Sequence, residues 1–424
     1  MLPRHIPATT PSAPDSAAGQ AGPGPGSAAA AAGVVPGSRL GSTQGHPVLC
    51  KAAVAFKPQA GLTVVDVVVE TPRSGEARIR MLCASICPTD TEALSCAASC
   101  STARFPCVLG HEGCGIVESV GPGVTSVQPG DYVVPCYLPF CGRCSVCENG
   151  KTNICGSGKP FTDAGLMHDG SVRFRTLDGQ AVYHFLGTST FSEYTVVNEV
   201  HLSKVDKRAA PDRACLLSCS VPSGMGAVFN TAQVEEGASA AVFGITSVGL
   251  VVLDALRLSN ARRIIAVDID NAKLEVAREW GATDCVNLKC HRGEVLQVIR
   301  DMTDGGVDYS FDCIGTSEVM QLALESCHIG WGTSVLLGAG GGAGAKACID
   351  QSQLLRGRVW TGSMLGGYKS RAEIPLLAER YIKGEIRLDK FQSRRISLTS
   401  IQQGIDTVAV GLTTEHQIVD FRCQ

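Results

Sequence analysis

The chain has 424 residues, of which 44% are hydrophobic, and its formal net charge is −3. Because one hydrophobic core rarely grows beyond about 250–300 residues, we expect two folded domains. The small net charge argues against a broad attraction to nucleic acid or anionic lipid, and no apolar run reaches the ~20 residues of a membrane span. We therefore expect a soluble globular protein with no nucleic-acid or membrane partner.

The first 45 residues are of low complexity, with Asp15 as the one acidic residue. Such a segment cannot bury enough apolar surface to offset the entropy of ordering it, which predicts a disordered tail at 1–45. The scarcity of acids also fits a transit peptide for a plastid or mitochondrion, although Arg4 and Arg39 are the only arginines. We expect a cytoplasmic protein, with organelle import as the alternative.

Residues 46–220 contain short segments rich in β-branched residues, such as LTVVDVVVE and ARIRMLCAS, separated by turn-forming residues. They predict a mainly β domain. Over residues 221–364, strands such as ASAAVF and RRIIAVDI alternate with helices such as SVGLVVLDALRL and NAKLEVAREWGA. This alternation predicts a doubly wound parallel sheet, so the fold class is α/β. Residues 365–424 return to mixed structure.

Four cysteines lie in CGRCSVCENGKTNIC with the spacing C-x2-C-x2-C-x7-C, namely Cys141, Cys144, Cys147 and Cys155. Two-residue gaps let successive sulfurs turn towards one centre, and four thiolates complete a closed zinc tetrahedron, which predicts a structural site. An iron–sulfur cluster is the main alternative, but the ferredoxin pattern has a last gap of three residues followed by proline. Disulfides and chance spacing also remain open. The chain has 20 cysteines and no secretory signal, which indicates a reducing compartment.

Three scattered residues supply a second ligand set, namely Cys87 in ICPTD, His111 in GHEGCG and Cys219 in LLSCS. Singly, each is more often a core residue. Together they form the Cys2His set of a catalytic zinc, which leaves a fourth position for substrate and lowers the pKa of an alcohol oxygen bound there.

Neighbouring residues fit supporting roles in this second set. Asp90 could fix the tautomer of His111, Glu112 could approach the metal, and Thr89 could accept the alcohol proton. Thr89 and Asp90 also suit the N-terminal cap of a helix, and without further information that is the better interpretation.

A possible dinucleotide turn follows the predicted strand AAVF and reads Gly244-Ile245-Thr246-Ser247-Val248-Gly249. A dinucleotide turn normally reads G-x-G-x-x-G, and here threonine replaces the middle glycine. Asp268 ends the next predicted strand, where an acid binds the ribose 2′-hydroxyl and repels a 2′-phosphate, which favours NAD over NADP. The alternative is a helix cap, a role for which Asp270 competes.

The motifs GHEGCGIVESVGPGV, HFLGTSTFSEYTVV, MTDGGVDYSFDCIG and GGYKS resemble those of the zinc-containing medium-chain alcohol dehydrogenases, near the glutathione-dependent formaldehyde dehydrogenase branch. The similarity runs from about Cys50 to Phe421. It implies a GroES-like catalytic domain at 46–220, completed by 365–424, and a Rossmann domain at 221–364. It also implies a homodimer that interconverts alcohols and aldehydes or ketones with NAD. The alternatives are an S-(hydroxymethyl)glutathione dehydrogenase, also described as an S-nitrosoglutathione reductase, and a non-catalytic dinucleotide-binding relative.

Carried over to this sequence, the resemblance implies two zinc ions per subunit. The catalytic ion is held by Cys87, His111 and Cys219, with Glu112 as an alternate ligand, and Thr89 relays the proton. The four-cysteine group holds the structural ion. Asp268 and Lys273 hold the adenosine ribose, and the nicotinamide side is lined by Leu337, Gly338 and Ala339.

The chain also departs from the family pattern. Thr246 and Ser247 replace common glycines, which predicts weaker or shifted cofactor binding. Pro88 and His416 stand where basic residues contact the pyrophosphate in many members, and Glu92 takes the place of the outer histidine of the proton relay. After Glu92 the loop EALSCAASCSTARF lacks the acids that bind glutathione adducts, and Lys159 lies near the position of an anchoring arginine. These departures argue against strict specificity for glutathione adducts.

Overall fold

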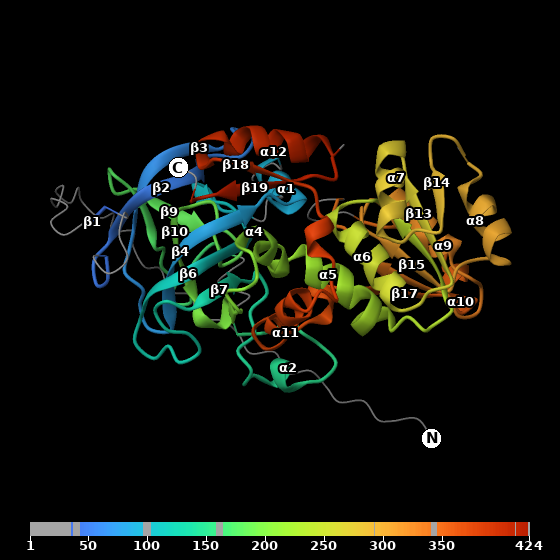
Figure 1. The fold of residues 1–424 in the computed structure, drawn as a ribbon, viewed down its shortest axis with the longest axis horizontal. Helices are drawn as coiled ribbons and strands as arrows, with labels where there is room; N and C mark the ends of the chain where they lie inside the picture. Colours follow the sequence, from blue (N-terminus) through green and yellow to red (C-terminus); the bar gives the residue numbers. More distant parts are fainter. Residues whose placement is uncertain are drawn as a thin grey trace, which may run out of the picture. The chain divides into compact units, whose positions relative to one another are not determined.

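The computed structural model describes residues 35–36, 43–95, 103–157, 164–291, 293–340, 346–411 and 413–422. Within the chain, Val34–Gln424 forms one compact unit (Figure 1). The predicted tail lies almost entirely outside the described residues. The same is true of Lys159 and of much of the loop after Glu92.

The first part of the compact unit contains two mostly antiparallel sheets. The first sheet has the order β1 (Val35–Pro36), β2 (Val48–Ala55), β3 (Thr63–Val69), β8 (Phe174–Thr176), β9 (Ala181–His184), β5 (Cys107–Val108). Because β5 pairs with β2 as well as with β9, the five strands from β2 to β5 in this order close into a ring. The second sheet has the order β11 (Leu202–Lys204), β7 (Tyr132–Pro135), β6 (Glu112–Val120), β4 (Glu76–Ser85), β19 (His416–Asp420), β18 (Ser393–Ile396), with β10 (Tyr194–Asn198) also on β4.

The last strands of the chain return to the second sheet. β19 runs antiparallel to β4, with Ile418 opposite Ser85, and β18 runs parallel to β19. Both faces of this sheet are covered, because Val117 and Val133 belong to one hydrophobic cluster whereas Cys114 and Val134 belong to another. The chain end therefore completes a sheet begun more than 300 residues earlier, as the pairing of residue 418 with residue 85 shows.

The middle of the chain forms a six-stranded, entirely parallel sheet (Figure 1). Its order is β14 (Asp284–Asn287), β13 (Arg263–Asp268), β12 (Ser239–Phe243), β15 (Tyr309–Asp312), β16 (Thr333–Leu336), β17 (Val359–Gly362). On β12, Ala240 and Val242 pack with α6 (Ser247–Leu258) and α7 (Asn271–Trp280), whereas Ala241 and Phe243 pack with α8 (Val295–Thr303) and α9 (Ser317–Ser326). Successive side chains of a strand point to opposite faces, so helices cover both faces of this sheet.

The helices that flank this sheet are α6 (Ser247–Leu258), α7 (Asn271–Trp280), α8 (Val295–Thr303) and α9 (Ser317–Ser326). Each of α6, α7 and α9 has a polar side chain that caps its first turn. The other helices are α1 (Pro88–Ser95), α2 (Ser145–Glu148), α4 (Pro211–Ala214), α5 (Ser220–Gly226), α10 (Ser352–Leu355), α11 (Ser370–Ile382) and α12 (Ile401–Val410).

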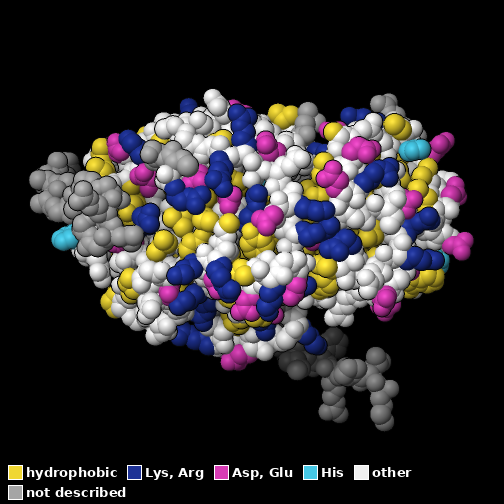
Figure 2. Space-filling view, viewed as in Figure 1, with side chains coloured by type: hydrophobic (Ala, Val, Ile, Leu, Met, Phe, Trp, Pro, Cys, Tyr) yellow, Lys and Arg dark blue, Asp and Glu magenta, His cyan; other side chains and the backbone are white. Residues whose placement is uncertain are grey.

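The surface carries charges of both signs. On the face shown in Figure 2, basic and acidic side chains are interspersed. Among the described residues, no helix is both long enough and apolar enough to span a membrane.

Candidate active site and metal centres

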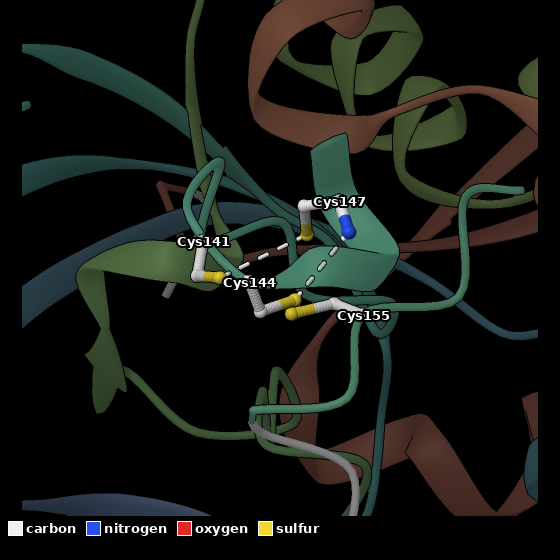
Figure 3. Close-up of side chains that lie close together, drawn as sticks. All are labelled: Cys141, Cys144, Cys147 and Cys155. Carbon is white, nitrogen blue, oxygen red and sulfur yellow. Dashed lines mark hydrogen bonds between the residues drawn. The ribbon is translucent and has the colours of Figure 1, made fainter. Parts of the chain in front are cut away.

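The four cysteines of the C-x2-C-x2-C-x7-C motif converge in one loop around α2. Figure 3 shows their sulfur atoms turned towards one another, and all four lie within 4.8 Å of one another. The Sγ atoms of Cys141 and Cys147 are 3.8 Å apart. A tetrahedron with metal–sulfur bonds of about 2.3 Å has edges of about 3.8 Å, so this spacing fits zinc.

The backbone of this loop favours the thiolate form at two cysteines before a metal arrives. At Cys141, hydrogen bonds outweigh burial and lower the pKa of the thiol. The N–H groups of Cys147 and Gly156 point at the sulfur of Cys144 and lower the pKa of that thiol to about 5. Burial instead raises the pKa of Cys147 to about 12. A thiolate is the form that binds metals, so Cys144 is ready to bind whereas Cys147 ionises only in the presence of the ion.

The second cluster brings together residues that are far apart in the sequence. The ligating atoms of Cys87, His111, Glu112 and Cys219 all lie within 4.8 Å of one another. Strand pairing brings the first three together, because Ser85 at the end of β4 lies opposite Glu112 at the start of β6. Cys219 is the residue that precedes α5.

The contact with Asp90 leaves one nitrogen of the His111 ring, Nε2, available to a metal ion. Its Nδ1 lies 2.9 Å from Oδ1 of Asp90, whose other oxygen accepts the Cys87 N–H at 3.0 Å. A hydrogen bond to a carboxylate places the ring proton on Nδ1. The Nε2 atom is then an acceptor; it is buried and has no hydrogen-bond partner within the described part of the chain. A metal ion would satisfy this atom.

Glu112 is the carboxyl-bearing member of this cluster. Its Oε1 accepts a hydrogen bond from the Ser220 hydroxyl at 2.6 Å, and burial raises the pKa of the carboxyl to about 8. The Cys87 sulfur accepts a hydrogen bond from the Cys219 thiol, which lowers the pKa of Cys87 and raises that of Cys219. The residues present thus fit a zinc ion held by two sulfurs and one imidazole nitrogen, with Glu112 within reach.

The glycines of GHEGCG are required by packing. Gly110 has a φ of +91°, and a Cβ there would lie 2.5 Å from the Thr190 hydroxyl oxygen. A Cβ on Gly113 would lie 2.6 Å from the Met81 side chain. These close approaches hold the start of β6, and with it His111, against Thr190 and the paired strand β4.

One large cleft of 1810 Å³ is lined by the metal-site residues and by most of the predicted cofactor residues. Cys87, Thr89, His111 and Cys219 line it, and so do Thr246, Ser247, Val248, Lys273, Leu337, Gly338 and Ala339. The others predicted for the cofactor, Gly244, Ile245, Gly249 and Asp268, are not among the residues that line the cleft. Asp268 is only 6% exposed.

Asp268 holds the turn rather than capping a helix. Its Oδ2 accepts the Ile245 N–H at 2.7 Å, and its Oδ1 accepts the N–H groups of Ile269 and Asp270. The cap of α7 is Asp270, which accepts the Ala272 N–H at 2.8 Å. Because a carboxylate oxygen has two acceptor positions, Oδ2 of Asp268 retains one in addition to the position that accepts the Ile245 N–H.

Lys273, which the resemblance predicts to hold the adenosine ribose, lines the cleft, and its ammonium donates to the Gly411 carbonyl at 2.5 Å. The departures from the family pattern lie in separate places. Pro88 and Glu92 line the cleft. His416 does not contribute to the lining; it is 4% exposed and packs against the Phe391 ring.

Sequence reasoning missed two side chains of the cleft. The Tyr137 ring packs edge-on against His111, and its hydroxyl bonds to Ser223 and to the backbone of Leu365. Asn153, within the four-cysteine loop, donates to the carbonyls of Met364 and Tyr368. Tyr137 belongs to no motif that the sequence marked, and Asn153 stands between the cysteines at a position that their spacing leaves unspecified, so no sequence signal marked either residue.

Comparison with known proteins agrees with this geometry. Two family models match, the alcohol dehydrogenase GroES-like domain at residues 73–207 and the zinc-binding dehydrogenase at residues 247–381. The chain is 47% identical to alcohol dehydrogenase class-3 of Oryza sativa subsp. japonica, over 87% of this chain and 96% of that relative. The chain belongs to the zinc-containing medium-chain alcohol dehydrogenase family.

Further relatives support the same assignment. The S-(hydroxymethyl)glutathione dehydrogenase of Haemophilus influenzae is 45% identical over 85% of this chain and 94% of that protein. The structure of benzyl alcohol dehydrogenase from Acinetobacter calcoaceticus superposes with a TM-score of 0.79 at 28% identity, over 88% of this chain and 99% of that one. The predicted α/β fold class, enzyme class and cofactors, zinc and NAD, are therefore confirmed.

Proposed function

We propose that this dehydrogenase acts on small alcohols with an apolar carbon chain and converts them reversibly to aldehydes or ketones. The observation that carries the proposal is the apolar surround of the ligand cluster. The rings of Tyr137 and Phe185 pack on His111, and the residues that follow them, Leu138 and Leu186, line the cleft. An apolar wall favours a hydrocarbon chain over a charged peptide.

The residues of the cleft have separable roles in this reaction. A zinc ion held by Cys87, His111 and Cys219 would supply the Lewis acid that lowers the pKa of the alcohol oxygen. Thr89, two residues beyond Cys87, accepts the alcohol proton. Glu92 stands one turn further along α1, and residues three apart share a helix face. Both line the cleft, so Glu92 receives the proton from Thr89 and releases it to solvent.

An S-(hydroxymethyl)glutathione dehydrogenase is the second candidate, favoured by the names of several relatives. A glutathione adduct carries an ammonium group and two carboxylates. Glu92 and Glu373 are the acids among the described residues of the cleft, and the sequence from 93 to 110 contains no acid. A site with so few acids is poorly matched to the ammonium group.

The experiment compares kcat/KM for ethanol, a longer primary alcohol and S-(hydroxymethyl)glutathione with NAD. We expect the longer alcohol to be preferred over ethanol by at least about tenfold, the effect of one or two extra buried methylenes, and to be preferred over the glutathione adduct as well. A preference for the adduct would select the second candidate. Absence of NADH formation with all three, in protein that contains zinc, would contradict both.

We also propose that the active form is a homodimer. β17 is the edge strand of the parallel sheet, and apolar side chains lie exposed near it, with Leu355 at 81%, Trp331 at 57% and Val359 at 49%. An exposed edge with apolar neighbours is suited to pairing with a second copy. Light scattering should give twice the chain mass, and V359K should give monomer; a monomeric wild type would contradict the proposal.

We propose a cytoplasmic location, supported by the two arginines in residues 1–45, which are few for a transit peptide. Fluorescent fusions of the full chain and of a chain lacking residues 1–45 test this. Both should give diffuse cytoplasmic signal, and organelle signal that depends on 1–45 would overturn it.

A further inference from the structure

Thr246, in the middle of the dinucleotide turn, is the N-terminal cap of α6. Its backbone is extended, with φ −85° and ψ 179°, and its hydroxyl oxygen accepts the Gly249 N–H at 3.2 Å. Thr246 also lines the cleft. The same side chain therefore stabilises the helix and occupies the surface that faces the cofactor site.

The two glycines on either side of Thr246 are required by the fold itself. Gly244 has a φ of +89°, and a Cβ there would lie 2.4 Å from the Ile314 side chain. A Cβ on Gly249 would lie 2.2 Å from the Gly244 carbonyl oxygen. At Thr246 the backbone is one that any residue adopts. A glycine at this position would serve only the approach of a ligand to the backbone.

Threonine at this position affects phosphate binding in two ways. The middle position is where the backbone approaches the cofactor's pyrophosphate, and a side chain there occupies that space. The hydroxyl also accepts a hydrogen bond from the Gly249 N–H. This N–H is one of the four amide donors at the start of α6 that have no partner within the helix. Free amides at a helix start are the donors that attract phosphate groups.

We propose that Thr246 sets the affinity of the enzyme for its cofactor, by weakening the binding of the pyrophosphate in exchange for a capped helix. NAD and NADH share this pyrophosphate, so Thr246 weakens the binding of both by the same factor. Weaker binding of NADH speeds its release, and product release limits turnover in many enzymes.

The test is T246G, measured in two ways on the full-length, zinc-loaded protein. NADH fluorescence titration should give a Kd about tenfold lower than that of wild type, and NAD titration should show the same factor. The melting temperature without cofactor should fall by about 2 °C, because the cap is lost. Tighter binding in a less stable protein is a result that a purely structural role for Thr246 does not produce.

T316G is the matched control. Thr316 caps α9 in the same way, accepting the Val319 N–H at 3.4 Å, and it is not among the residues that line the cleft. T316G should lower the melting temperature by a similar amount and leave the Kd for NADH unchanged. T246S keeps the cap oxygen without the methyl group, so its Kd should lie between those of wild type and T246G.

Three outcomes would overturn the proposal. An unchanged or higher Kd for NADH in T246G would show that the side chain is neutral or binds the cofactor directly. An equal fall in Kd for T316G would show a general effect of helix stability. If T246G does not fold, a Kd for NADH in T246S equal to that of the wild type would also overturn the proposal.

Discussion

The two metal centres of this dehydrogenase are built in opposite ways. The four-cysteine site draws all its ligands from one loop, residues 141–155, and its geometry follows from short spacings. The Cys87–His111–Cys219 site draws its ligands from three separate segments, which the pairing of β4 with β6 and the start of α5 bring together. One loop can shape a closed site by itself, whereas an open site in a cleft needs the whole fold to hold it.

The largest effect is expected for C219S. Loss of one thiolate from the open cluster should reduce turnover by about 10³-fold or more, because the Lewis acid loses its position. The chain should lose one zinc per subunit and keep a melting temperature within a few degrees of wild type, measured by metal analysis and calorimetry. Normal alcohol oxidation by C219S would refute the assignment of this cluster.

C144S should lower the stability of the protein, whereas C219S should lower its turnover. Replacing Cys144, whose thiol the loop backbone prepares as a thiolate, removes a metal whose binding free energy is also folding free energy. We expect the melting temperature to fall by about 10 °C. An unchanged melting temperature would mean that the site is not structural, and the contrast between the two centres would disappear.

D90N tests how the open site is oriented. Asparagine can still accept the Cys87 N–H, but it lacks the charge that holds the ring proton of His111 on Nδ1. Loss of such a partner typically lowers metal affinity or activity by about 10–100-fold. D270N, at the cap of α7, is the control and should retain activity. Equal activities of the two variants would show that Asp90 acts only in the backbone turn.

The smallest effect is expected for E92Q, seen in the pH dependence of alcohol oxidation. Burial raises the pKa of Glu92 to about 6, so the carboxylate is ionised and able to accept a proton above pH 6 and is protonated below it. In the wild type, kcat/KM should fall as the pH drops below 6. In E92Q this decrease at acid pH should be absent, and kcat/KM at pH 7 should be a few-fold lower than in the wild type. E373Q, which alters the other carboxylate among the described residues of the cleft, should still show the fall in kcat/KM below pH 6.

The α/β fold class could be predicted from the sequence because strand and helix periodicities are local. On β12, alternate residues serve opposite faces, as expected for a strand buried on both sides. The four-cysteine site was also recognisable, since its ligands lie within one loop. The domain boundaries at 45, 220 and 364 stay predictions, since no observation tests them.

The cofactor turn shows where a local pattern was insufficient. The sequence pattern marked Thr246 as a departure without indicating what its hydroxyl does, because capping depends on the backbone angles of the turn. Asp268 and Asp270 were equal candidates for the cap of α7. The structure distinguishes them, because Asp268 is turned back to the Ile245 N–H across the sheet edge.

By itself, the sequence determined the alternation of strands and helices in the middle of the chain and the convergence of the four cysteines, because these depend on residues close together in the chain. Tertiary structure decided the open site. Cys87 and Cys219 are over a hundred residues apart, and their sulfurs meet because β4 pairs with β6 and α5 begins beside them. It also decided that the hydroxyl of Thr246, at the cofactor turn, caps a helix. Contacts between distant segments follow from sheet register and packing, which no local spacing encodes.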